Sequence, residues 1–186
     1  YLHNAFVYSL ARAMGYWAPA TKFAAMFIHS GGGPLDYTSY AGLTIMTDRI
    51  RVAKNRVNIF SLSAGDTTAP NVTGGYILRF DHPEANSEYY TWTTRQGTTL
   101  SVDTPKLNVI APAQVDYITG YVQQMEDAMA ADRAGNYATH NYLSYLDRPS
   151  WVDYHLLNVF VENDDAFQFS EYFTKDVNGP IKAGPV

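Results

Sequence analysis

Apolar residues recur at three- and four-residue intervals in two parts of the chain, and this spacing predicts two amphipathic helices. The first covers residues 4–14 and ends at Gly15, which is typical of a helix stop. The second covers residues 113–131 and has Pro112 in its first turn, a position that tolerates proline. The apolar stripes consist of Phe6, Val7, Leu10, Ala11 and Met14 in the first helix and of Val115, Ile118, Val122, Met125 and Met129 in the second.

A third helix is predicted near the end of the chain, and it leads into a polar loop and a hairpin. Ser150 and Asp153 have the spacing of a capping box, so the helix is expected to begin at Ser150. It runs to residues 163–165, after which an aromatic strand begins at residues 171–173. An Asn-Gly pair at residues 178–179 then predicts a hairpin turn into a last strand.

Alternating and β-rich segments in the first half of the chain predict strands. Residues 22–28 and 41–46 read as a hairpin with a long connection, and residues 74–81 and 89–95 read as two further strands. Strands that precede helices, with a closing hairpin, are typical of an α+β domain. The 186 residues contain no repeat or linker, so we expect one domain over residues 1–186.

Composition removes several classes of function. The net charge of −5 and the pI of 5.4 argue against nucleic acid as a partner, because phosphates require a basic face. With a mean hydropathy of −0.23 and no apolar run of bilayer length, no membrane insertion is expected. The absence of cysteine excludes a disulfide scaffold, a thiolate zinc site and a cysteine nucleophile.

The loop Asn163-Asp164-Asp165 has two interpretations. Asn and Asp commonly end a helix in an Asx-turn, without any function. A carboxylate delivered by a helix and backed by an aromatic strand could instead orient an acceptor hydroxyl and accept its proton, or help to hold a divalent metal. The spacing alone leaves both interpretations open.

The segment 47–56 has the same ambiguity. It contains four cationic residues in a protein that is acidic overall, which indicates either a solvated charged turn or a site where cations converge on phosphate. Residues 31–33 are three glycines, but no Gly-Lys-Ser/Thr follows and Pro34 removes an amide, so they do not form a phosphate-binding loop.

The order of five segments resembles the CotH kinase family, the atypical protein kinases related to spore coat protein H. The similarity covers essentially the whole chain. It is carried by the opening helix with Pro19, the strand and charged turn at 42–57, the Thr-Gly-Gly-Tyr strand at 73–81, the Asn163 to Asp165 loop, and the run from Ser170 through Lys175-Asp176 to Gly184-Pro185-Val186.

This resemblance implies an atypical, degenerate protein-kinase-like fold with antiparallel strands and a helical part. It also implies transfer of phosphate from ATP, with Mg²⁺ or Mn²⁺, to Ser or Thr of a protein substrate outside the cytoplasm, in a spore coat, on a cell surface or secreted. Asp165 matches the family's catalytic aspartate and is implied as a metal ligand. Asp48, Arg49 and Arg56 fall on the charged nucleotide-side segment, and Asp81 falls on the acidic end of the Gly-Gly-Tyr strand.

The sequence departs from the family pattern at several positions. Asp48-Arg49 replaces the usual Glu-Lys, Arg79 replaces a Glu, and the glycines at 31–33 belong to an insertion. The family's Trp-Asp-x-Asp, whose aspartates would bind metal, would follow Val186. We therefore expect these residues to be a fragment that is incomplete at both ends and inactive by itself.

Two alternatives to a kinase follow from these departures. One is a catalytically inactive CotH-like module that acts in surface adhesion or coat assembly. The other is an extracytoplasmic hydrolase that uses Asp81 and Asp165 as an acid pair, which requires the two carboxyl groups to lie within roughly 10 Å of each other.

Overall fold

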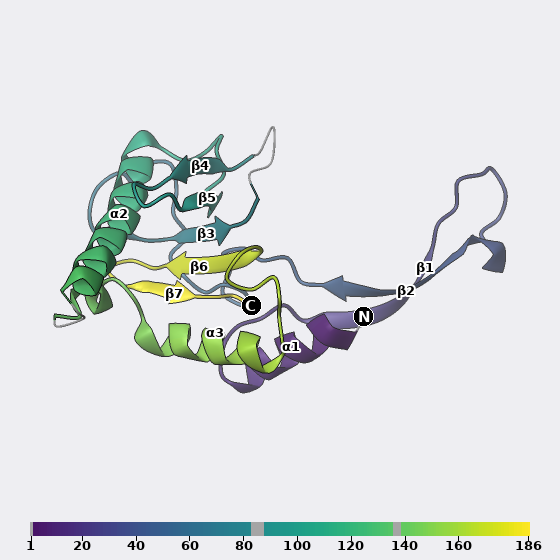
Figure 1. The fold of residues 1–186 in the computed structure, drawn as a ribbon. Helices are drawn as coiled ribbons and strands as arrows, with labels where there is room; N and C mark the ends of the chain where they lie inside the picture. Colours follow the sequence, from purple (N-terminus) through teal and green to yellow (C-terminus); the bar gives the residue numbers. More distant parts are fainter. Residues whose placement is uncertain (1, 83–87, 136–138) are drawn as a thin grey trace.

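The computed structural model describes residues 2–82, 88–135 and 139–186, and it shows an α+β protein with two antiparallel sheets (Figure 1). One sheet has two strands, β1 and β2, and the other has five in the order β4-β5-β3-β6-β7. The elements are α1 (Leu2–Ala13), β1 (Thr21–Phe27), β2 (Tyr40–Thr47), β3 (Tyr76–Phe80), β4 (Tyr90–Thr93), β5 (Thr99–Thr104), α2 (Pro112–Ala134), α3 (Arg148–Phe160), β6 (Glu171–Lys175) and β7 (Ile181–Ala183), with short 3-10 turns at Tyr37–Ser39, Asn71–Thr73 and Asn141–Ser144.

The α+β class and the three predicted helices are confirmed, with ends that differ by a few residues. The hairpin at β1 and β2, the strand after the two glycines, and the closing hairpin at β6 and β7 are confirmed as well. The strand β5 was not predicted, although its buried Leu100 and Val102 alternate with Ser101 and Asp103.

The predicted capping box at Ser150 and Asp153 is wrong. The helix α3 begins at Arg148, so Ser150 lies inside its first turn and not at its start. The Ser150 hydroxyl donates to the carbonyl of Asp147 (2.8 Å). The same hydroxyl accepts a hydrogen bond from the Ala183 amide (3.1 Å), so Ser150 joins α3 to β7. Asp153 accepts a short hydrogen bond from the Tyr16 hydroxyl instead of completing a cap.

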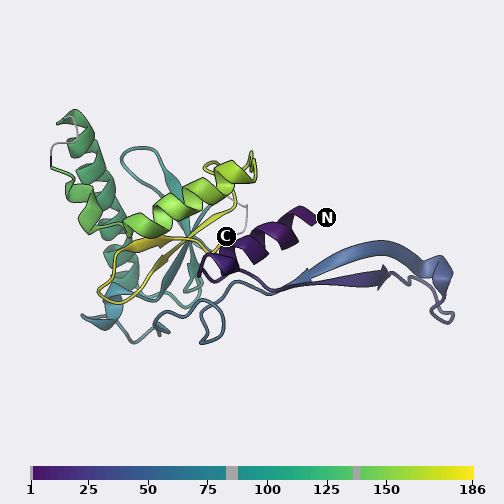
Figure 2. The same ribbon diagram turned by 90° about the horizontal axis from the view of Figure 1, so that it is seen from below.

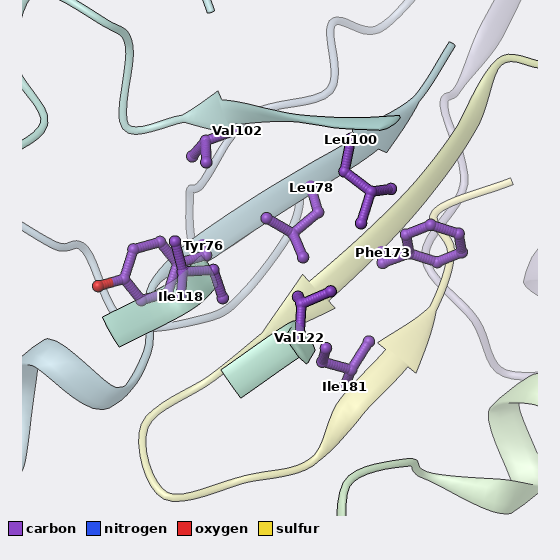
Figure 3. Packing of buried hydrophobic residues seen from close by; sticks show 8 residues of the cluster. All are labelled: Tyr76, Leu78, Leu100, Val102, Ile118, Val122, Phe173 and Ile181. Carbon is purple, nitrogen blue, oxygen red and sulfur yellow. The ribbon is translucent and has the colours of Figure 1, made fainter. Parts of the chain in front are cut away.

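The main core lies between one face of the five-stranded sheet and α2. In β3, Tyr76 and Leu78 point to this face, opposite residues of β5 and β6 that point the same way. Ile118 and Val122 contribute to the cluster from α2, which packs on this face of the sheet (Figure 3). Burial of these side chains provides the main driving force for folding of the sheet and α2. The cluster consists of Tyr76, Leu78, Leu100, Val102, Ile118, Val122, Phe173 and Ile181.

A second, smaller cluster joins the N-terminal helix to α3. Val7 and Ala11 of α1 are buried with Ala18 and with Leu157 of α3. Phe6 and Met14, which the predicted stripe places on the same face, stay largely exposed. The helix α1 therefore buries a narrower stripe than its sequence indicates.

Close backbone packing explains the two glycines before β3. A Cβ atom at Gly74 would lie 2.0 Å from the amide nitrogen of Val177, so only glycine fits beside the β6–β7 turn. Gly75 has a positive φ of 93° and its Cβ would approach Leu62 at 2.7 Å. These contacts fix where β3 meets β6, the strand that follows the polar loop.

The hairpin of β1 and β2 extends away from the rest of the molecule (Figures 1 and 2). Its strands pair from Thr21 opposite Thr47 to Phe27 opposite Tyr40, with an irregularity after Met26. Phe27 makes an edge-on contact with Tyr40, with ring centroids 5.4 Å apart. The glycines at 31–33 lie in the loop between its strands.

Candidate functional site

The loop between α3 and β6 carries Asp165 and is fastened to its neighbours by polar contacts. The Asn163 side chain donates to the Asn158 side chain (2.9 Å), and Asn158 is buried inside α3. The backbone amide of Phe167 donates to a carboxylate oxygen of Glu171 (2.9 Å), the first residue of β6. The loop is thus held at both ends by side chains of the elements that it connects.

An aromatic contact joins the same loop to the end of β3. The ring of Phe169 stacks on His82, with centroids 3.8 Å apart and planes inclined by 23°. Because His82 follows Asp81 directly, this contact brings the acidic end of β3 beside the Asp165 loop. Two sequence segments that lie more than eighty residues apart therefore meet at one end of the sheet.

The backbone of this loop is strained. Glu162, Phe167 and Ser170 all have positive φ angles (50°, 68° and 58°), which non-glycine residues seldom adopt. Such residues persist only where surrounding contacts hold them, and they concentrate at functional sites. The contacts of Asn163, Phe167 and Phe169 provide that support here.

Asp165 is exposed at the top of this loop. Its carbonyl accepts hydrogen bonds from the amides of Gln168 (3.2 Å) and Phe169 (2.9 Å), which closes a turn around it. Its carboxylate makes no hydrogen bond or ion pair with any residue of the ranges 2–82, 88–135 and 139–186. The loop therefore presents a carboxylate whose acceptor oxygens are available to an incoming group.

Asp81, in contrast, is fully engaged by neighbouring donors. Its Oδ2 accepts two hydrogen bonds from Arg79, at 3.0 Å from Nε and 2.7 Å from Nη2, and its Oδ1 accepts from the His82 amide (2.8 Å). Burial raises the pKa of Asp81, but the hydrogen bonds and charge of Arg79 outweigh that effect and lower it below its ordinary value. A carboxylate of lowered pKa is poorly suited to be the general acid of a hydrolase.

In the charged segment after β2, two of the predicted nucleotide-site residues bind each other. Arg56 forms an ion pair with Asp48 (2.6 Å) and also donates to the carbonyl of Arg49 (3.3 Å). These bonds close the segment into a turn. The Arg49 side chain is exposed, and its positive charge is a minor contributor, after the bond and charge of Lys106, to the lowered pKa of Glu88.

A polar cluster that the sequence did not predict surrounds Tyr89. The Lys106 ammonium lies 4.0 Å from the Tyr89 ring centroid and the Arg79 guanidinium lies 5.1 Å from it. Lys106 also pairs with Glu88 (3.0 Å) and Asp103 (3.2 Å). Arg79 and Asp103 alternate with core residues of β3 and β5, so they point away from α2. A cluster of this kind depends on strand pairing and could not be read from local sequence.

In the described part of the chain, no three side chains of His, Asp or Glu lie together in a way that could hold a metal ion. Asp165 is therefore a single candidate ligand rather than part of a formed metal site. Within the same residues, none of the helices has the length and apolar character needed to cross a membrane.

The profile of the family described as CotH kinase protein matches residues 1–185. The chain belongs to the CotH kinase family. No curated protein and no solved structure matches it.

In this member of the CotH kinase family, three of the five segments that carry the resemblance meet around β3 and β6: the Gly-Gly-Tyr strand, the Asp165 loop and the closing hairpin. The two glycines at 74–75 pack on the β6–β7 turn, and Phe80 at the end of β3 pairs with Glu171 at the start of β6. The Asp165 loop enters at that same end. Asp81 and Asp165 thus lie in neighbouring segments, while Asp48 and Arg56 form a separate ion-paired turn.

Proposed function

We propose that this CotH kinase protein transfers the γ-phosphate of ATP, with Mg²⁺ or Mn²⁺, to a Ser or Thr of a protein substrate outside the cytoplasm, in a spore coat or at a cell surface. Membership of the family supports phosphoryl transfer as the reaction class. A kinase-like arrangement of the chain is part of the same proposal. The observation that carries it is the exposed Asp165 carboxylate on a strained loop held by Asn158, Glu171 and His82.

In this proposal Asp165 accepts the hydrogen bond of the substrate hydroxyl and takes its proton as the oxygen attacks the γ-phosphorus. Phosphoryl transfer depends mainly on positioning and on compensation of charge, so a carboxylate on an anchored loop is suited to the task. The fastening of the loop holds the acceptor oxygens in place before the substrate arrives, which lowers the entropy cost of alignment.

The divalent cation would compensate charge on the phosphates. Magnesium in such sites uses one or two carboxylates together with phosphate oxygens and water. Asp165 offers one carboxylate, and no three-residue cluster exists in the described ranges, so these residues alone do not form the metal site. We assign Asp165 as a candidate ligand of the ion.

The cations proposed to contact the ATP phosphates differ in their availability. Arg49 is exposed, whereas Arg56 is partly buried and paired with Asp48. We therefore assign phosphate contact first to Arg49. Arg56 and Asp48 hold the turn that presents Arg49, and Asp81 holds the Arg79 guanidinium in place at the end of β3.

The test is transfer of labelled γ-phosphate by the full-length protein, with Mg²⁺ or Mn²⁺, to itself or to a Ser-rich acceptor. Loss of a general base slows a reaction roughly 10²- to 10⁴-fold, so Asp165→Asn is expected to lose activity to that extent while folding normally. Asp164→Asn is the matched control, because Asp164 is an exposed carboxylate in the same loop. Equal rates for wild type and Asp165→Asn would refute the role of Asp165.

One observation favours the second candidate, an inactive surface or coat-assembly module. Asp48 and Arg56 neutralise each other, and Arg79 neutralises Asp81, so three of the five predicted site residues are already paired within the protein. A full-length protein that binds no ATP with either metal and transfers no label would decide in favour of this alternative.

A further inference from the structure

A large hollow lies on the α2 side of the five-stranded sheet, and none of the predicted site residues is among the described residues that line it. It has a volume of about 1060 Å³ and lies between the sheet, the second half of α2 and the beginning of α3. This volume is at the upper end of the range for small-molecule sites in proteins. Its walls are mostly apolar, and they include Phe80, Leu100, Met125, Leu146, Trp151 and Phe173.

Two carboxylates interrupt these apolar walls. Glu126 of α2 lines the cavity, and its Oε2 is buried without a hydrogen-bond partner among the described residues. Glu171 of β6 lines it as well, and one of its carboxylate oxygens accepts a hydrogen bond from the amide of Phe167. A buried carboxylate oxygen without a donor is costly, because it has lost water and gained nothing in exchange.

The charge balance of the lining favours a cation. Among the described residues that line the cavity, Arg133 alone is basic, and it is an exposed residue near the end of α2. Burial raises the pKa of Glu171, which means that a positive ligand nearby would stabilise its ionised form. An anionic ligand would be repelled by both carboxylates.

Aromatic rings add a second reason for a cation. Trp151 and Phe173 stack with centroids 5.0 Å apart, and both line the cavity together with Phe80 and Tyr142. Aromatic faces attract ammonium groups, and the attraction is stronger where water is excluded. Apolar walls, aromatic faces and two acids together match a ligand with an apolar body and a cationic end.

We propose that this cavity binds an apolar amine, with its ammonium group beside Glu126 and its aliphatic or aromatic body against Trp151 and Phe173. Asp165, Arg49 and Asp81 do not line the cavity, and binding of the amine does not require phosphoryl transfer, although Glu171 of the wall also anchors the Asp165 loop. The ligand's positive charge compensates the charge of the Glu126 carboxylate at the cavity wall, and its body displaces water from the apolar walls.

The experiment measures binding of three probes of equal length to the full-length protein by calorimetry: phenylbutylamine, phenylbutanol and phenylbutyrate. A charge pair in a partly buried site contributes enough to separate the amine from the alcohol by about tenfold or more. We expect the amine to bind most tightly and the carboxylate probe least. In Glu126→Gln the advantage of the amine over the alcohol is expected to fall to about threefold or less, with binding of the alcohol unchanged.

Two further variants test the location and the specificity of this effect. Asp116→Asn removes the same charge from an exposed position of the same helix and is expected to leave the preference for the amine intact. Ala130→Trp places a large side chain at an exposed residue of the cavity wall and is expected to weaken binding of all three probes. Equal affinity for amine and alcohol, or no saturable binding of any probe, would overturn the proposal. So would an equal loss of preference in Asp116→Asn.

Discussion

The five-stranded sheet and the β1–β2 hairpin are built from similar alternating sequences, yet they have different surroundings. In β3, Tyr76 and Leu78 are 0% and 1% exposed beneath α2. In the hairpin, Phe23, Leu43 and Phe27 share one face, and they are 42%, 52% and 37% exposed. Alternation therefore predicts a strand and its apolar face, but it does not predict what covers that face.

The difference has consequences for stability. Two strands alone are marginally stable in water, whereas three or more strands with a covered face form an independent unit. The sheet has that cover from α2, and its strands come from segments far apart in the chain. The hairpin depends on its own cross-strand pairs, such as Phe27 with Tyr40. Substitutions in the two regions should therefore affect global stability very differently.

The largest difference is expected between two glycine substitutions. Gly74→Ala places a Cβ at 2.0 Å from the backbone of Val177, and the β6–β7 turn has to move, at a cost of about 3 kcal/mol or more in the free energy of unfolding. Gly32→Ala in the hairpin loop meets no atom within 4 Å and should change that free energy by less than about 0.5 kcal/mol. Urea unfolding of both variants measures the contrast, which equal midpoints would contradict.

A leucine pair tests the same contrast by creating a cavity in place of a backbone clash. Leu78→Ala leaves a cavity in the core beneath α2 and should lower the free energy of unfolding by about 2–5 kcal/mol. Leu43→Ala removes a half-exposed side chain of the hairpin and should cost less than about 1 kcal/mol. If Leu43→Ala were as destabilising as Leu78→Ala, the face of the hairpin would be covered in solution.

The last prediction concerns a buried lysine of the sheet and a pH dependence rather than a loss of packing. Burial lowers the pKa of Lys175 to about 8 from an ordinary value of 10.5, while its ammonium donates to the Thr73 carbonyl (2.5 Å) and lies 4.6 Å from the Tyr121 ring centroid. Between pH 8 and 10.5 the unfolded chain holds a proton that the folded chain has released, so this lysine makes the folded state more stable as the pH rises.

The comparison of wild type with Lys175→Met over this pH range isolates that contribution. The free energy of unfolding of wild type, minus that of Lys175→Met, is expected to increase from pH 8 to pH 10.5. A difference that stays constant with pH would contradict this prediction, because it would show that the pKa of Lys175 is close to its ordinary value.

Local sequence patterns predicted much of this structure, because each pattern is a property of neighbouring residues. The helical stripes around Ile118, the hairpin turn at 178–179 and the glycines before β3 all depend on spacing within a few residues. The strand β5 was missed although its alternation of Leu100 and Val102 was present. The family could also be recognised from the order of short segments, and the match over residues 1–185 confirms it.

Part of the candidate site could be predicted and part could not. The position of Asp165 in a loop between a helix and a strand followed from the sequence, and the assignment of its chemistry stays a prediction. Ser150 shows why local reasoning failed elsewhere: its spacing to Asp153 matches a cap, but the amide of Ala183 claims its hydroxyl. That partner lies 33 residues further along the chain.

By itself, the sequence determined the α+β class, the helices and most strands, the family, and the position of the Asp165 loop between a helix and a strand. Tertiary structure alone decided the strand order, the pairing of Asp48 with Arg56, and the cavity between the sheet and α2. The physical reason is range. Periodicity and turn chemistry act between near neighbours, whereas the contacts of Glu126, Glu171 and Trp151 around one cavity exist only once distant segments have packed.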